Sequence, residues 1–195
     1  SLIDGAKKKI WEISRFIAQG QPAPELRVGL VAYRDVGDEY VTRFYDLSGD
    51  LDAVYQNLSS FTASGGGDPP EHVAKALEDA VSRASWSQDK STLRLVYLVG
   101  DAPPHRDYND GLNYQAIAQR AGERGIRINT IRCGADRATE TAWREIAARS
   151  HGEYASIDQS GGVVDTSTPY DDELARQAPR TVTIADGLIV ADVTN

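Results

Sequence analysis

The chain has 195 residues, of which 41% are hydrophobic and 26% are charged, so its length and composition predict one globular domain with one core. Its net charge of −8 argues against a nucleic-acid-binding protein, which usually carries a basic patch, and suits a protein that holds a cation. No apolar run approaches a membrane span, and the first residues lack the pattern of a secretory signal. The single cysteine, Cys133, excludes an internal disulfide and a cysteine zinc site, and it is expected to be buried at a strand end.

The first part of the chain alternates between helical and extended patterns. Apolar residues at helical spacing and short apolar runs predict elements over 3–17 (helix), 26–34 (strand), 40–46 (strand), 50–60 (helix) and 70–85 (helix). A tight turn at Gly37 and Asp38 joins the two strands, and such a short connection favours an antiparallel pair. A glycine-rich loop over 62–70 precedes the last of these helices.

The second part continues the alternation, with elements predicted over 93–99 (strand), 113–124 (helix), 126–132 (strand), 139–150 (helix) and 153–157 (strand). The run LRLVYLV over 93–99 is almost entirely apolar, as expected of a central parallel strand. The pattern therefore predicts an α/β fold with a doubly wound, mostly parallel central sheet flanked by helices and one antiparallel edge strand. Residues 158–180 are predicted to be a connection, and 181–192 to return to strand.

Two candidate sites follow from the rule that open α/β sheets bind ligands at the carboxyl ends of their strands. Asp101 comes directly after the apolar strand 93–99, and its simpler interpretation is a loop residue that caps a turn. Asp68 and Glu71 follow three glycines at the start of a helix, where either carboxylate could bind a metal. They could equally cap that helix and interact with its dipole.

Three sequence pieces together resemble the von Willebrand factor A family: RVGLVAYRD (27–35), GGGDPPEHVAKAL (65–77) and LVYLVGDAPPH (95–105). The resemblance covers residues 1–157 in the family's order and implies a Rossmann-like fold. It also implies a metal-ion-dependent adhesion site. That site uses an Asp-x-Ser/Thr-x-Ser motif after the first strand, a Thr or Asp from a second loop and an Asp from a third. By position, Asp68 and Asp101 take the last two roles.

The chain departs from the family at the first strand, because no residues precede Ser1 to form it. The chain instead ends in LIVADVTN, and joining Asn195 to Ser1 would read Asp-Val-Thr-Asn-Ser. We therefore expect one domain over 1–195 that is circularly permuted or broken at the metal loop, with 181–195 as the displaced first strand and its metal loop. The predicted metal ligands are Asp192, Thr194, Ser1, Asp68 and Asp101.

A physical argument supports this replacement strand. In the family the first strand lies in the middle of the sheet, and its loss would leave two central edges with unpaired backbone groups. Segment 185–191 is therefore predicted to pair in parallel with both 26–34 and 93–99. The alternative is that 181–192 forms an added hairpin at the edge of a truncated domain.

The resemblance implies a binding function rather than catalysis. Hydroxyl and carboxylate oxygens suit Mg²⁺, or Mn²⁺ or Ca²⁺, and a protein partner's Asp or Glu would complete the coordination shell. A metal-free interaction domain is one alternative, and a metal-dependent hydrolase that uses His105 near Asp101 is another. The sequence has neither a Gly-x-Ser-x-Gly elbow nor a P-loop. We thus expect an adhesion or interaction module without nucleic-acid binding, membrane insertion or enzyme activity.

Overall fold

A computed structural model of the chain describes residues 25–61, 70–157 and 187–194, the last range as backbone. Several sequence predictions lie outside these residues: the helix over 3–17, the connection over 158–180, and Ser1, Asp68 and Asn195.

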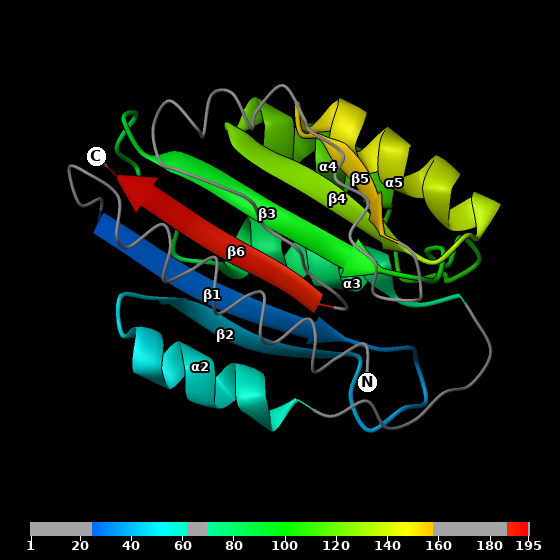
Figure 1. The fold of residues 1–195 in the computed structure, drawn as a ribbon. Helices are drawn as coiled ribbons and strands as arrows, with labels where there is room; N and C mark the ends of the chain where they lie inside the picture. Colours follow the sequence, from blue (N-terminus) through cyan, green and yellow to red (C-terminus); the bar gives the residue numbers. More distant parts are fainter. Residues whose placement is uncertain (1–24, 62–69, 158–186, 195) are drawn as a thin grey trace.

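Six strands form one sheet in the order β2-β1-β6-β3-β4-β5 (Figure 1). They are β1 (Glu25–Tyr33), β2 (Thr42–Ser48), β3 (Leu93–Gly100), β4 (Ile126–Cys133), β5 (Tyr154–Ile157) and β6 (Gly187–Thr194). Strand β3 pairs in parallel with β4, β4 pairs in parallel with β5, and β2 is an antiparallel strand at the sheet edge. The predicted α/β class, its antiparallel edge strand and the strand positions are confirmed.

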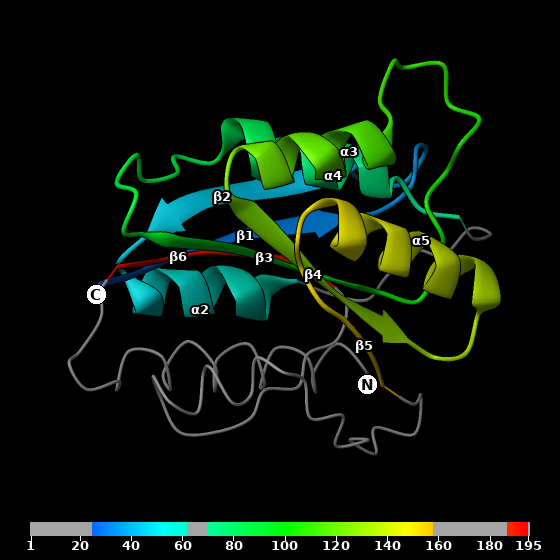
Figure 2. The same ribbon diagram turned by 90° about the horizontal axis from the view of Figure 1, so that it is seen from above.

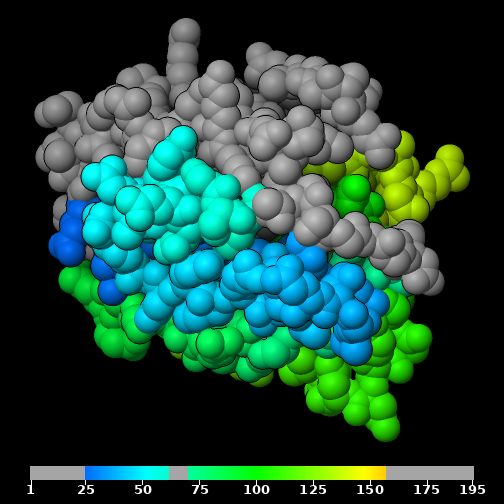
Figure 3. Space-filling model, turned by 90° about the horizontal axis from the view of Figure 1, so that it is seen from below, coloured from blue at the N-terminus to red at the C-terminus, as the bar shows by residue number. Residues whose placement is uncertain are grey.

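Helices cover both faces of the sheet (Figure 2). They are α2 (Leu51–Ser60), α3 (Val73–Glu78), the π-helical turn η1 (Asp79–Arg83), α4 (Tyr114–Glu123) and α5 (Arg137–Arg149). Helix α2 lies on one face, where Figure 3 shows it beside β2, and α3, α4 and α5 lie on the other. Within the described ranges, no helix has the length and apolarity needed to cross a membrane.

The helix starts follow from local chemistry, because three helices begin after an Asp or Asn whose side chain accepts a backbone N–H. Asp50 accepts from Ala53 at α2, Asn113 from Ala116 at α4, and Asp136 from Thr139 at α5. The apolar faces behind these caps form two clusters, one on each side of the sheet. Cys133 is buried at the end of β4, as the sequence predicts.

Strand β6 fills the central slot between β1 and β3, which confirms its predicted position and excludes the edge hairpin. The predicted direction is wrong, because β6 runs antiparallel to both neighbours. Gly187 lies opposite Val99 at the carboxyl end of β3, and Val193 lies opposite Leu93 at its amino end. Strand β5 ends at the same end of the sheet at which β6 begins, the carboxyl end of β3 and β4. A permuted first strand would run parallel, so this arrangement does not support joining Asn195 to Ser1.

Engineered disulfides test the direction of β6. Asp192 and Arg94 are opposite each other, at the Cα separation of about 4.5–5.5 Å that suits a disulfide. The pair Arg94→Cys and Asp192→Cys should therefore crosslink on mild oxidation, detected as a mobility shift on a non-reducing gel. The control pair Asp101→Cys and Asp192→Cys should not, because seven strand residues separate their positions by roughly 23 Å. Crosslinking of the control pair alone would show a parallel β6.

Candidate functional site

Three segments meet where β1 and β3 end: the turn after β1, the residues before α3 and the loop after β3. The backbone joins two of them, because the Glu71 N–H donates to the Pro103 carbonyl (3.0 Å) and the His105 N–H donates to the Glu71 carbonyl (3.1 Å). The third is held through Asp35, which follows β1. We call the site formed by Asp35, Glu71, Asp101, His105 and Tyr108 the carboxyl edge.

Glu71 is the least satisfied residue of the carboxyl edge. Its Oε2 atom is buried and has no hydrogen-bond partner among the residues that the structure describes. Desolvation and the nearby carboxylates of Asp35, Asp38 and Asp101 raise the pKa of Glu71 to about 7. A buried carboxylate oxygen without a donor is costly, and neighbouring negative charges increase that cost. The carboxyl edge is therefore short of positive charge at Glu71.

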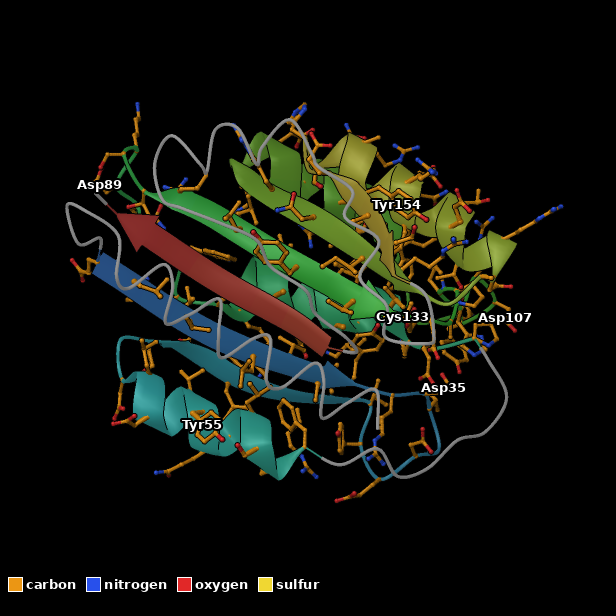
Figure 4. The ribbon with its side chains drawn as sticks, in the orientation of Figure 1. Asp35, Tyr55, Asp89, Asp107, Cys133 and Tyr154 are labelled. Atoms are coloured by element: carbon orange, nitrogen blue, oxygen red, sulfur yellow. The ribbon has the colours of Figure 1, made fainter. Side chains whose placement is uncertain are left out.

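Asp35, by contrast, is held by two side chains from the loop after β3. The Tyr108 hydroxyl donates to Asp35 Oδ1 at 2.5 Å, and His105 Nε2 lies 3.3 Å from Asp35 Oδ2. The other ring nitrogen of His105 lies 2.8 Å from Asp107, and the rings of His105 and Tyr108 stack with centroids 4.1 Å apart. Figure 4 shows Asp35 and Asp107 together at one end of the sheet, with Asp89 at the other.

These contacts also shift two further ionisations. Partial burial lowers the pKa of His105, but the hydrogen bond to Asp107 and the charge of Asp35 outweigh it and leave the pKa above its ordinary value. Desolvation and the Asp35 carboxylate raise the pKa of Tyr108 to about 12. Tyr108 therefore remains a hydroxyl donor throughout the physiological range.

His72 links helix α3 to the same loop. Its Nδ1 accepts the Lys75 N–H (3.3 Å) as the N-cap of α3, and its Nε2 lies 3.0 Å from Asp110. Its ring centroid also lies 4.9 Å from that of Tyr108. One interpretation of the sequence was capping by Asp68 with Glu71 near the helix dipole, whereas α3 begins at Val73 and Glu71 lies before it. Because His72 is the N-cap, Glu71 lies outside α3 and its side chain does not cap the helix.

The structure does not bring the five predicted metal ligands together. Asp101 is exposed at the carboxyl edge, and Ser1 and Asp68 lie outside the described residues. The register places Asp192 opposite Arg27 and Arg94, near the amino ends of β1 and β3 and at the far end of the sheet from Asp101. Thr194 lies farther still in the same direction. Within the described ranges, no three His, Cys, Asp or Glu side chains are arranged to hold a metal.

A cavity of about 380 Å³ lies away from the carboxyl edge. It is lined by residues around the amino ends of β1 and β3: Glu25, Arg27, Ser85, Trp86, Ser87, Asp89 and Thr92. Its polar groups are largely engaged with the protein itself, since Arg27 donates to the Ser85 carbonyl and Trp86 to the Ala80 carbonyl. The unsatisfied carboxylate at Glu71 therefore makes the carboxyl edge the better candidate site.

The raised pKa of Glu71 predicts how pH affects stability without metal. Between its ordinary value of 4.5 and about 7, the folded protein binds a proton that the unfolded chain has released, so Glu71 lowers stability as pH rises through this window. Glu71→Gln should therefore raise the melting temperature at pH 8 in EDTA and leave it nearly unchanged at pH 4.5. An equal effect at both pH values would contradict the assigned environment of Glu71.

No protein-family model and no curated protein matches the chain in sequence. Solved structures do resemble it. BatB from Bacteroides thetaiotaomicron, described as a conserved hypothetical protein, has a TM-score of 0.56 at 17% identity over 88% of this chain and 85% of its own. The SpRpn10 VWA domain has a TM-score of 0.48 at 14% identity over 77% of this chain and 71% of its own. The likeness to BatB shows a shared fold.

Proposed function

We propose that this domain is a protein-interaction module that binds a divalent cation at the carboxyl edge and, through the cation, a carboxylate of a partner protein. One observation carries the proposal: Glu71 Oε2 is buried without a donor from the described part of the chain, near the charges of Asp35, Asp38 and Asp101. A cation would supply the missing positive charge and lower the pKa of Glu71. The von Willebrand factor A resemblance supports the same location, at the carboxyl ends of the strands.

The donors at this edge fit a hard cation, because carboxylate oxygens are the preferred ligands of Mg²⁺, Mn²⁺ and Ca²⁺. In the proposal Glu71 and Asp101 hold the ion, and Asp68, from the neighbouring glycine-rich loop, is a third ligand. Mg²⁺ usually retains several waters, so a small protein ligand set leaves positions for water and for the partner's carboxylate. The ion supplies a charge that attracts this carboxylate, and the protein side chains fix where the ion lies. Binding, and no catalytic step, follows from this arrangement.

The proposal changes the ligand set expected from the sequence. Asp101 and Asp68 keep their predicted roles, and Glu71 is added. Asp192 and Thr194 are left out, because the antiparallel β6 places them near the opposite end of the sheet. Ser1 is left out with them, since its role depends on the joined metal loop.

A displayed random-peptide library tests the proposal. The immobilised domain should enrich peptides that contain Asp or Glu in the presence of Mg²⁺ and release them in EDTA. Glu71→Gln should lose this enrichment. Asp89→Asn, which removes a carboxylate charge at the other end of the sheet, should keep it.

The main alternative is a metal-free interaction domain, and the same experiment separates the two. Enrichment that is equal in Mg²⁺ and EDTA, and unchanged by Glu71→Gln, would favour that alternative. Enrichment of basic peptides only in EDTA would show that the carboxylates themselves form the binding surface.

A further inference from the structure

We infer that Tyr108 and His105 are positioning residues that hold Asp35 within electrostatic reach of Glu71 and so set the geometry of the proposed cation site. This inference rests on the proposed function, which it deepens by naming residues that act through Asp35 rather than on the ion.

The hydrogen bonds of Asp35 carry the inference. Tyr108 donates to Oδ1 at 2.5 Å and His105 Nε2 lies 3.3 Å from Oδ2, so both carboxylate oxygens already contact a protein side chain. A carboxylate engaged in this way is suited to a supporting position behind the metal ligands rather than to direct coordination. Such supporting groups orient the ligands and adjust their charge.

The donors are themselves fixed by packing. The Tyr108 ring stacks on His105 at 4.1 Å and lies 4.9 Å from His72, whose Nδ1 caps α3. His105 is also held at its other ring nitrogen by Asp107. Consequently the turn after β1, the start of α3 and the loop after β3 form one connected unit around Glu71.

This connection keeps negative charges close to Glu71. Asp35, Asp38 and Asp101 each repel the Glu71 carboxylate. An unheld Asp35 would move into water, and the field that attracts a cation to Glu71 would weaken. These two contacts keep the charge of Asp35 in place, and they leave Glu71 Oε2 as the carboxylate oxygen without a partner among the described residues.

The Tyr108→Phe variant tests this role, because it removes one hydroxyl and leaves the ring to stack. Removal of a supporting group typically weakens metal binding by about 10–100-fold, so we expect Mn²⁺ affinity, measured by calorimetry, to fall by at least about tenfold. The matched control is Tyr55→Phe on α2, away from the carboxyl edge (Figure 4), which should leave the affinity unchanged.

A double-mutant cycle distinguishes positioning from a general structural role. If Tyr108 acts through Asp35, Tyr108→Phe should have no further effect on Mn²⁺ affinity once Asp35→Asn is present. Additive losses in the double variant would overturn the inference. So would an unchanged affinity in Tyr108→Phe.

A second measurement needs no metal and keeps the inference separate from the proposed function. In EDTA, Tyr108→Phe should speed amide hydrogen exchange in the turn at 35–38, because the loop no longer holds Asp35. Unchanged exchange there would overturn the inference. Suppose that the wild-type protein fails to bind Mn²⁺ while Tyr108→Phe still speeds exchange at 35–38. The proposed function is then wrong, and the inference that Tyr108 positions Asp35 is retained.

Discussion

Replacing Asp101 with alanine is expected to abolish the rise in melting temperature that Mg²⁺ gives the wild-type domain. A ligand that binds only the native state stabilises it by mass action, by about 2.7 kcal/mol at one hundred times its dissociation constant. Asp101 directly follows β3 and contributes to the charge around Glu71, so its loss removes one proposed ligand. Because Asp101 is exposed, we expect the stability in EDTA to change by no more than about 0.5 kcal/mol.

Thermal melts of the wild type and Asp101→Ala, each with and without Mg²⁺, measure this effect. Asp89→Asn serves as the control, since Asp89 is an exposed aspartate near the opposite end of the sheet. A full Mg²⁺-dependent shift in Asp101→Ala would contradict the assignment of Asp101. The same loss in Asp89→Asn would show that the effect reflects overall charge.

Replacing Trp143 with alanine is expected to lower the free energy of unfolding by about 3–5 kcal/mol. Trp143 lies on α5, is fully buried against the sheet and donates its indole N–H to the Ile131 carbonyl at 3.1 Å. The substitution leaves a large cavity and removes this hydrogen bond. Its ring also packs near Gly100, the last residue of β3, so the loss weakens the packing directly below Asp101.

Denaturant unfolding measures this change, and Trp143→Phe is the matched comparison. Phenylalanine retains much of the apolar volume but lacks the N–H, so its loss should be clearly smaller. A loss below about 1 kcal/mol in Trp143→Ala would contradict the burial of Trp143 between α5 and the sheet.

The sequence predicts most elements of this fold because the length and period of an apolar run carry that information. The direction of β6 is different. An apolar run fits a central slot of the sheet in either direction, so the run over 188–191 predicts the position of β6 and not its direction. The helix predicted over 70–85 is observed as two elements, α3 and η1, and contacts with residues distant in sequence lie at their junction. Buried Asp79 contacts Lys75, Thr42 and Arg83, and the helix is π-helical from that residue.

The candidate site is predictable in part. Asp101 follows from the rule for strand ends, and Glu71 follows from its place at the glycine-rich loop. The Asp35–Tyr108 hydrogen bond joins residues 73 positions apart, so no local pattern contains it. The position of Asp35 directly after a buried strand was the one available signal, since that strand ends at the same sheet edge as β3.

Crystals soaked in Mn²⁺ test the central claim most directly, because anomalous scattering locates the ion without assumptions about its ligands. We expect one strong peak at the carboxyl edge, within direct coordination of oxygens of Glu71 and Asp101, and no peak there in Glu71→Gln. No peak at saturating Mn²⁺, or a peak only at the opposite end of the sheet near Asp192, would contradict a cation site at the carboxyl edge.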